Sequence, residues 1–263
     1  MNTCFRGIIC FCLAGCLGLC LSVQAGDLQR DIQNYKLSQS HYLKAKQAFS
    51  DNKYELMRRE LEKCIAQFAG HDGAHYLMAQ LLYQEGIYPQ ANEHILTAKS
   101  CFHDMVELRA VARTELHDRL RTRRHALEEK MALYQAEMAR AGSADSVALS
   151  GVISKIRNEI SDIDRQLQET FTEPKELPAG YCFVHGNILL KQGDVAGAHD
   201  QYMETIRLEP TRVEAYNNLA HIYYTKGNYK VALAILQRAL ASHLTVNPEF
   251  LAEVKNKAGG QLE

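Results

Sequence analysis

The feature that most constrains the fold is an internal repeat with a period of 34 residues. Residues 41–45 (HYLKA) return as residues 75–79 (HYLMA), and Gly193 returns as Gly227 at the same offset. A fixed period of this length indicates stacked supersecondary units, because one such unit cannot bury its apolar face alone. Stacks of this kind usually present a continuous surface to a partner rather than hold a reactive group.

The clearest unit spans residues 213–246, where apolar residues recur at spacings of three and four along two segments. The first stripe contains Tyr216, Leu219, Ala220 and Tyr223, and the second contains Tyr229, Ala232, Leu233, Leu236, Ala239 and Leu240. Gly227 and Asn228 provide a turn between them, so the unit is predicted to be a hairpin of two amphipathic helices. Residues 72–105 and 179–212 follow the same pattern, and residues 38–71 form a degenerate unit with Asn52 at the turn.

These units resemble the tetratricopeptide repeat, with small residues such as Ala220 and Ala232 where two helices must cross closely. Leu244 stands where that family has a proline. The resemblance implies a helical-hairpin solenoid whose first helices line a concave groove for an extended peptide or a partner helix. The groove positions carried over to this chain are Tyr42, Lys46, Phe49, Tyr76, Gln80, Tyr83, Phe183, Asn187, Leu190, Asn217, Asn218, His221 and Tyr224.

Two readings of these groove positions remain open from the sequence. Aromatic and amide groups suit peptide recognition, yet the aromatic residues could equally pack against a neighbouring unit. Asn187 and Asn218 match two asparagines with which some members of the family bind a terminal carboxylate. Phe183 stands where those members have the accompanying lysine, which weakens the carboxylate reading.

Residues 106–178 break the period and follow a heptad rhythm. One seam contains Leu120, Arg124, Leu127, Met131, Tyr134 and Met138, and the other contains Leu149, Ile153, Ile156, Ile160, Ile163 and Leu167. The short loop at residues 141–145 predicts an antiparallel coiled-coil hairpin, which we call the arm. Its register predicts three ion pairs: Arg121 with Asp164, Glu128 with Arg157, and Lys130 with Glu159. Arg124 faces Ile163 in this register and should extend its charge outward.

The N-terminal segment differs from the rest of the chain. Arg6 precedes an apolar run at residues 7–23, and the sequence VQA before Gly26 has the form of a signal-peptidase site. We therefore expect an extracytoplasmic protein, most simply of the bacterial periplasm or envelope. The run LAGC ending at Cys16 also resembles a lipobox, so lipidation at Cys16 and an uncleaved anchor are the two alternatives. Contact with a membrane is expected only through this segment.

The predicted chain is thus all-α, a tetratricopeptide-repeat solenoid interrupted by a long antiparallel coiled-coil hairpin. Its parts are a signal peptide at 1–25, a lead-in segment at 26–37, two repeats at 38–105, the hairpin insertion at 106–178, two repeats at 179–246, and a capping helix with a tail at 247–263. Asn247 before Pro248 marks the start of the capping helix.

Charge and motif content speak against several function classes. The chain has 30 basic and 31 acidic side chains, so no net charge favours a nucleic acid partner. Outside residues 1–25 only Cys64, Cys101 and Cys182 remain, and their spacing matches no metal or disulfide motif. The stretch at residues 71–75 holds two histidines and an aspartate, but His75 repeats His41, which favours a structural role.

The sequence therefore predicts no catalytic residue, no metal site and no cofactor. The leading hypothesis is a non-enzymatic adaptor of the cell envelope with a protein or peptide partner. The alternative is an oligomerising structural protein whose arm pairs between protomers, and the sequence leaves the oligomeric state open. An enzyme would need a convergent polar pocket, which no motif here indicates.

Overall fold

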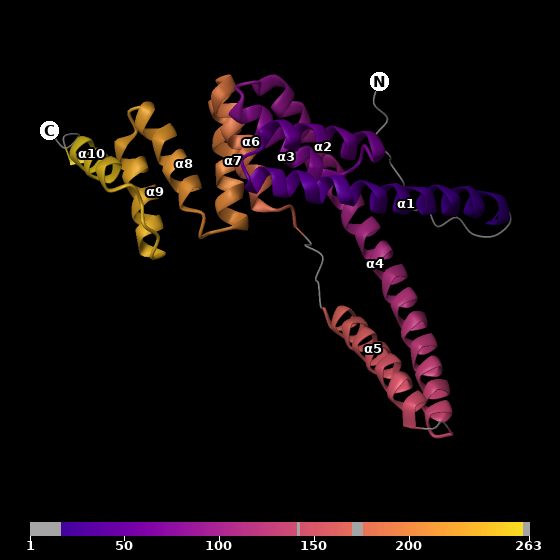
Figure 1. The fold of residues 1–263 in the computed structure, drawn as a ribbon. Coiled ribbons are helices and arrows are strands. Elements are labelled where there is room, and N and C mark those ends of the chain that lie inside the picture. Colours follow the sequence, from indigo (N-terminus) through magenta and orange to yellow (C-terminus); the bar gives the residue numbers. More distant parts are fainter. Residues whose placement is uncertain (1–16, 141–142, 170–175, 260–263) are drawn as a thin grey trace.

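The computed structural model describes residues 17–140, 143–169 and 176–259. Within these ranges the chain contains ten α-helices and no β-strand, which confirms the all-α class (Figure 1). The helices are α1 (Leu17–Ser50), α2 (Tyr54–Gln67), α3 (Asp72–Gln84), α4 (Tyr88–Met138), α5 (Ser143–Gln168), α6 (Ala179–Gln192), α7 (Val195–Leu208), α8 (Val213–Thr225), α9 (Tyr229–Ala241) and α10 (Pro248–Gly259).

Four helical hairpins form the stack: α1 with α2, α3 with α4, α6 with α7, and α8 with α9. Each turns through a residue with positive φ at the same repeat position, namely Asn52 at 57°, Gly86 at 80°, Gly193 at 86° and Gly227 at 76°. Glycine adopts this left-handed conformation without steric cost, and asparagine tolerates it better than most residues. The degenerate first hairpin therefore keeps its turn without a glycine.

Close crossing of the two helices in each hairpin depends on one small residue of the first helix. Ala45, Ala79 and Ala220 are fully buried at this position, and Gly186 occupies it in the third hairpin. A Cβ atom built on Gly186 would lie 2.8 Å from the ring of Tyr202, which is itself fully buried. The third hairpin therefore has glycine where the other hairpins have alanine, and the missing methyl group leaves room for the ring of Tyr202 on the second helix.

The apolar core has two parts that share α6. One cluster joins the first two hairpins and receives Tyr181, Val184 and Ile188 from one face of α6. The other joins α7, the fourth hairpin and α10, and the opposite side of α6 packs against it with Phe183 and Leu190. α6 therefore packs against both clusters and joins the two halves of the stack.

The two ends of the stack are finished differently. In inner units the first helix turns apolar residues toward the preceding unit, as Met78 and Leu81 of α3 do, both nearly fully buried. The equivalent residues of α1 are Lys44 and Gln47, which are exposed. Among the residues that the structure describes, the outward positions Lys44 and Gln47 thus give this end a polar character, in the manner expected of a terminal repeat.

At the other end α10 takes the place of the first helix of a fifth unit. It begins 35 residues after the start of α8, close to one period, and the Asn247 side chain accepts a hydrogen bond from the backbone N–H of Phe250 at 3.0 Å. Val254, which is fully buried, occupies the position that Ala220 holds in α8. The helix covers the apolar end of the last hairpin.

α4 is a single helix of 51 residues that serves both the second hairpin and the arm. It passes through the predicted boundary at residues 105 and 106 without interruption, because no Gly or Pro follows Pro89 within it. α5 returns antiparallel alongside the distal half of α4 (Figure 1). Its isoleucines at 153, 156, 160 and 163 are all buried, so α5 packs its apolar seam against α4 of the same chain.

In the described part of the arm the ion pairs differ from those expected. Arg124 donates from Nε to Asp164 Oδ1 at 2.7 Å, and Arg123 pairs with Glu159. Arg121 instead pairs with an acidic residue of its own helix. The expected pairs were wrong because Arg124, on the seam, extends outward and pairs with both Asp164 and Glu128, while Arg123 pairs with Glu159.

α1 is longer than the repeat requires and crosses the base of the arm. The predicted lead-in segment at 26–37 lies inside this helix. Ile32 is buried in a small cluster with Met105 and Leu108 of α4, and Lys36 Nζ lies 2.7 Å from Glu115 Oε2. The picture shows α1 running on past α4 after the crossing (Figure 1).

The predicted leader is only partly covered by the structure. Residues 1–16, which include Arg6 and Cys16, lie outside the described residues, and residues 17–25 form the start of α1. Among the helices that are described, none combines the length and apolar character needed to cross a membrane. Cleavage, lipidation and anchoring therefore all stay predictions.

Candidate partner-binding surface

The predicted groove residues fall on three repeated positions of the four first helices α1, α3, α6 and α8, and we call each set a row. The inner row contains Tyr42, Tyr76, Phe183 and Asn217; the middle row contains Lys46, Gln80, Asn187 and His221; and the outer row contains Phe49, Tyr83, Leu190 and Tyr224. Asn218 follows the inner row in α8. The structure shows that these rows differ in how much of each side chain is exposed and free to contact a ligand.

The inner row packs between units. A Cβ atom at Gly73 would lie 2.8 Å from Tyr42 Oη, and one at Gly180 would lie 2.9 Å from Tyr76 Oη. Each tyrosine thus fits over a glycine at the second residue of the next first helix. Burial raises the pKa of Tyr42 to about 12 and also raises that of Tyr76. Because both tyrosines are committed to inter-unit contacts, the packing interpretation is the better one for them.

The same applies to the rest of the inner row. The guanidinium of Arg212, which precedes α8, lies 5.4 Å from the ring centroid of Phe183. The side-chain oxygen of Asn217 is buried and has no hydrogen-bond partner among the described residues. A ligand on the surface cannot reach this buried oxygen, so Asn217 also belongs to the packing of the inner row.

The middle row is polar and more accessible. Lys46 and His221 are exposed, whereas Gln80 and Asn187 are half-buried. Gln80 Nε2 donates to Tyr76 Oη at 3.1 Å, which places this amide along the surface. The row therefore presents one hydrogen-bonding or charged group from each successive first helix.

The two asparagines compared with a carboxylate-binding pair contact each other instead. Asn187 Oδ1 accepts hydrogen bonds from Tyr202 Oη at 2.8 Å and from Asn218 Nδ2 at 3.0 Å. One amide group of Asn218 is thereby committed to the protein itself, and Phe183 supplies no cation. The arrangement lacks the charge-assisted contact that makes carboxylate binding strong.

The outer row is apolar in the first three hairpins. Phe49, Tyr83 and Leu190 are half-buried and pack on the edge of the core. In the fourth hairpin Tyr224 donates a hydrogen bond to Glu253 of α10, and the ring of Phe250 lies 5.6 Å from its own. α10 therefore contacts the fourth member of the outer row, which the first three members do not share.

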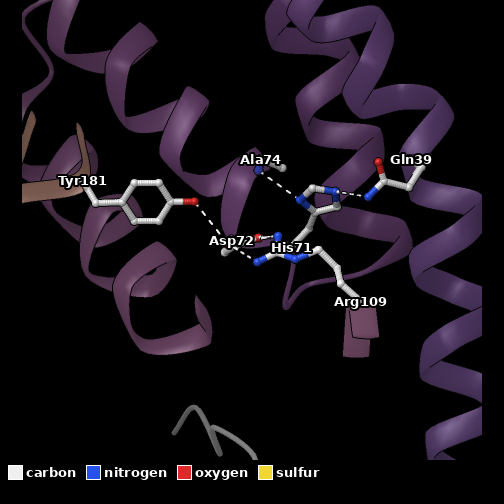
Figure 2. Close-up of polar contacts among 6 residues, drawn as sticks. All are labelled: Gln39, His71, Asp72, Ala74, Arg109 and Tyr181. Carbon is white, nitrogen blue, oxygen red and sulfur yellow. Dashed lines mark hydrogen bonds and ion pairs between the residues drawn. The ribbon is translucent and has the colours of Figure 1, made fainter. Parts of the chain in front are cut away.

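A buried polar cluster beneath this surface was not predicted from the sequence (Figure 2). Asp72, the first residue of α3, has a side chain only 2% exposed. Arg109 of α4 donates to both of its oxygens, with Nη1 3.1 Å from Oδ1 and Nη2 3.3 Å from Oδ2. Tyr181 Oη of α6 donates to Oδ2 at 3.1 Å. We call Asp72, Arg109 and Tyr181 the junction cluster, because it joins three helices.

One signal in the sequence pointed to this cluster. The residue equivalent to Asp72 is Ser38, Ala179 and Val213 in the other units, so an acid at this position is peculiar to the second unit. Its partners were not predictable in the same way, because Arg109 lies beyond the end of the period. Tyr181 gives no signal in the sequence either, because its hydroxyl contacts Asp72, which is far from it along the chain.

The histidines considered for metal binding have other roles. His71 precedes α3, and its Nδ1 accepts a hydrogen bond from the Ala74 N–H at 3.1 Å. His75 Nε2 lies 2.9 Å from the Ala69 carbonyl oxygen and donates to it, so His75 Nδ1 accepts from His94 Nδ1 at 2.8 Å. Nowhere in the described ranges do three or more His, Cys, Asp and Glu side chains gather so as to hold a metal ion.

Burial decides the charge state of these imidazoles and of the cysteines. It lowers the pKa of His71 and of His94 to about 4, and it also lowers that of His75. The three cysteines outside residues 1–25 are free thiols. Burial raises the pKa of the Cys64 thiol to about 11, which makes it a poor nucleophile.

Comparison with known proteins gives a family-model match in the C-terminal half of the chain. A family model described as "Tetratricopeptide repeat" matches residues 183–243, which cover most of the third and fourth hairpins. A curated human protein, Protein O-mannosyl-transferase TMTC1, is 33% identical over 95 residues, which amount to 35% of this chain and 11% of that protein. The chain thus corresponds to about a tenth of this relative, and the activity in its name is that of the relative.

Solved structures with a similar arrangement have low identity to this chain. A thermophilic TPR protein of Thermus thermophilus is 18% identical, with 86% of this chain and 100% of that chain covered and a TM-score of 0.34. PilW, a type IV pilus biogenesis factor, is 14% identical over 85% and 88% of the two chains, with a TM-score of 0.39. PilF of Pseudomonas aeruginosa is 13% identical over 86% and 88%, with a TM-score of 0.36.

The family assignment therefore rests on the family-model match and on the repeated hairpin geometry. The matched hairpins keep the glycine turns, the small crossing residue and the packing of each first helix on the preceding unit. Residues 183–243 thus match the tetratricopeptide repeat model, and the first two hairpins repeat their geometry at the same period.

Proposed function

We propose that this chain is a non-enzymatic adaptor that binds an extended peptide or a partner helix along its first helices. One observation carries the proposal: the middle row is polar and accessible, and beside it the outer row is apolar and half-buried. Each of the first three hairpins contributes one residue to each row. The middle row contains Lys46, Gln80 and Asn187, and the outer row contains Phe49 and its equivalents in the next two hairpins. A surface of this composition suits a ligand with both backbone groups and apolar side chains to satisfy.

The spacing of the rows favours a periodic ligand. Packed helices lie about 8–10 Å apart, so neighbouring members of a row are separated by roughly that distance. A chain in the polyproline II conformation advances about 3.1 Å per residue with three residues per turn, so every third side chain lies on one face and would meet the next member of the outer row. A helix advances about 5.4 Å per turn, so every seventh residue would do the same. We therefore expect apolar side chains in the ligand at intervals of three or of seven.

The proposed location is extracytoplasmic, in a bacterial envelope or periplasm. The basis is the pattern of residues 1–25, with Arg6 before an apolar run and a small-x-small sequence before Gly26. In such a setting a protein or peptide partner is expected, and contact with a membrane would come through the N-terminal segment, including a lipid on Cys16 if that alternative applies. Mass spectrometry of the N-terminus from the native host distinguishes cleavage, lipidation and anchoring.

The alternative of an arm that pairs between protomers has less support. The isoleucines of α5, such as Ile156 and Ile163, are buried against α4 of the same chain. A second protomer would have to displace this pairing to form the same seam. Sedimentation analysis decides between the two, since an arm-paired protein would be a dimer that dissociates when Ile156 is replaced with aspartate.

Site-specific photo-crosslinking in the native host tests the proposed surface. A photoreactive amino acid at Gln80, in the middle row, should capture a protein partner. The same amino acid at Met203, which is exposed on α7 outside the three rows, serves as the matched control. Alanine at Lys46 and Leu190 should weaken capture at Gln80, and Lys46→Ala, at an exposed position, should do so without lowering the melting temperature. Capture at Met203 alone, or capture at Gln80 that ignores both alanine substitutions, would contradict the proposal.

A further inference from the structure

The junction cluster stands at the point where the arm leaves the stack. Asp72 begins the first helix of the second unit, and Arg109 lies on α4 one turn beyond the end of that unit. Tyr181 belongs to α6, which resumes the stack after the arm. The cluster thus joins the helix before the arm, the arm itself and the helix after the arm in one set of hydrogen bonds.

A buried charged cluster is a poor choice for stability alone. Asp72 is removed from water almost completely, and apolar residues of similar volume stabilise such sites as well or better. What the charges add is a defined orientation of the two helices, because a planar guanidinium binds a carboxylate in one plane. The other units have Ser38, Ala179 and Val213 at the position of Asp72, and none of those units carries an arm.

The contacts continue from the cluster to the candidate binding surface. The ring of Tyr181 is stacked on that of Tyr76, with centroids 4.6 Å apart and planes 13° from parallel. Tyr76 in turn accepts a hydrogen bond from Gln80 of the middle row. A change in the direction of α4 at Arg109 therefore has a continuous path of contacts, through Tyr181, to the residues at the middle of the surface.

We propose that the junction cluster is a conformational device that fixes the direction of the arm and transmits its displacement to Tyr76 and Gln80. When the arm is pushed aside, the two hydrogen bonds from Arg109 to Asp72 must lengthen or break. Tyr181 shares the same carboxylate, so its ring shifts on Tyr76. The arm and the surface then respond to each other, which is the requirement for coupling between two sites.

The arm is also held by contacts between α1 and α4 that do not involve the junction cluster. α1 crosses α4 near Ile32, and Lys36 pairs with Glu115 on the same side. Loss of the junction cluster should therefore not free the arm completely. It should leave the arm held by the crossing with α1 and by the first half of α4 in the second hairpin, so that the arm takes up a wider range of directions.

Distance measurements between spin labels on the full-length chain test the direction of the arm. Ketone-bearing amino acids at positions 133 and 230 carry the labels, one on the exposed distal part of α4 and the other on α9. Arg109→Met should broaden the distance distribution at least about twofold, and Tyr181→Phe should broaden it less. The matched control is Arg121→Met, because Arg121 is exposed on the same helix and pairs within it. Equal widths in Arg109→Met and the control would overturn the proposal.

A double variant separates direction from stability. Arg109→Met alone leaves Asp72 buried without its cation and lowers the melting temperature. Arg109→Met combined with Asp72→Asn removes both charges and should recover most of that loss. The proposal requires the double variant to be stable and still to give a broad distribution. A narrow distribution in the recovered double variant would reduce the cluster to a structural ion pair.

Transmission to the surface is read from fluorescence. The chain contains no tryptophan, so Tyr76→Trp introduces a single indole stacked on Tyr181. In that background Arg109→Met should shift the emission maximum to longer wavelength, while Arg121→Met should not. An unchanged maximum in Arg109→Met, with a broadened distance distribution, would refute the transmission half of the proposal. Neither readout uses a binding partner, so both stand apart from the proposed adaptor function.

Discussion

The imidazole of His71 ties the stability of the stack to pH in a way that a single substitution isolates. His71 is buried, and in its neutral form it caps α3 by accepting a hydrogen bond from the Ala74 N–H. Protonation would place a second N–H against that donor and would bury a charge. Burial accordingly lowers the pKa of His71 from 6.5 to about 4. Asparagine at this position can accept the same hydrogen bond and does not titrate.

The sign follows from the direction of the shift. The folded pKa of His71 is depressed below the unfolded value, so below about pH 6.5 the unfolded chain binds the proton and the folded chain does not. Stability is therefore present above that pH and is lost as pH falls toward 4. With these two pKa values, His71 alone costs about 2 kcal/mol between pH 7 and pH 5, and about 3 kcal/mol by pH 4.

Urea unfolding followed by far-ultraviolet circular dichroism measures this effect. The free energy of unfolding, extrapolated to zero denaturant at pH 7, 6 and 5, should fall about 2 kcal/mol less in His71→Asn than in the wild type. His94 and the other buried histidines are present in both proteins, so their contribution cancels. His103→Asn, at an exposed position of α4, is the control and should follow the wild type. If the curves of His71→Asn and wild type are parallel over this range, the reasoning fails.

Substitutions at three further positions probe the packing. Gly186→Ala should lower the free energy of unfolding by about 1–3 kcal/mol, because its Cβ would lie 2.8 Å from the Tyr202 ring; an unchanged urea midpoint would contradict this. Asn52→Ala should cost about 1 kcal/mol, because alanine pays more for a φ of 57°, while Asn52→Gly should be at least as stable as the wild type; melting temperatures check both. Val254→Ala should cost about 2 kcal/mol and increase hydrogen exchange in α10, and protection equal to the wild type would show that the helix does not need its buried anchor.

Much of the fold was predictable because the residues that pack the helices together recur at the repeat spacing. Each first helix buries one small residue per unit, and that residue recurs at the period with the turn that follows. Even a degenerate turn was readable, since Asn52 occupies the glycine position and adopts the same backbone conformation. The position of α10 followed from Asn247 and Pro248, which begin a helix by capping chemistry that is local to the sequence.

The ends of the long helices were not predictable from the period. A repeat pattern that stops does not end a helix, and α4 continues past Met105 because its sequence contains no helix breaker there. The lead-in segment was likewise absorbed into α1. Helix breaking depends on local residues, whereas the period depends on contacts between units, so the two boundaries need not coincide.

The candidate surface was only partly predictable, for a related reason. Tyr42 and Lys46 point from the same helix toward the same side, and the sequence of α1 does not tell which of them meets the next unit. The answer lies in Gly73, 31 residues later, which leaves room for the Tyr42 hydroxyl. The pairing of Asp72 with Arg109 was harder still, because it depends on how α4 and α6 are placed in space rather than on spacing along the chain.

The antiparallel arm has a consequence for the order in which the chain folds. α6 must pack against α3 and α4 across the residues of the arm, and closing a loop of about 74 residues costs roughly 2 kcal/mol more entropy than closing one of about 10. When α5 pairs with α4 first, only the short segment from Gln168 to Ala179 remains to be closed. The arm then acts as a local folding nucleus that lowers the effective contact order of the whole stack. Ile160→Ala, which weakens the arm seam, should slow refolding of the repeats in stopped-flow circular dichroism, while a chain with the arm excised and a short loop in its place should refold at the wild-type rate.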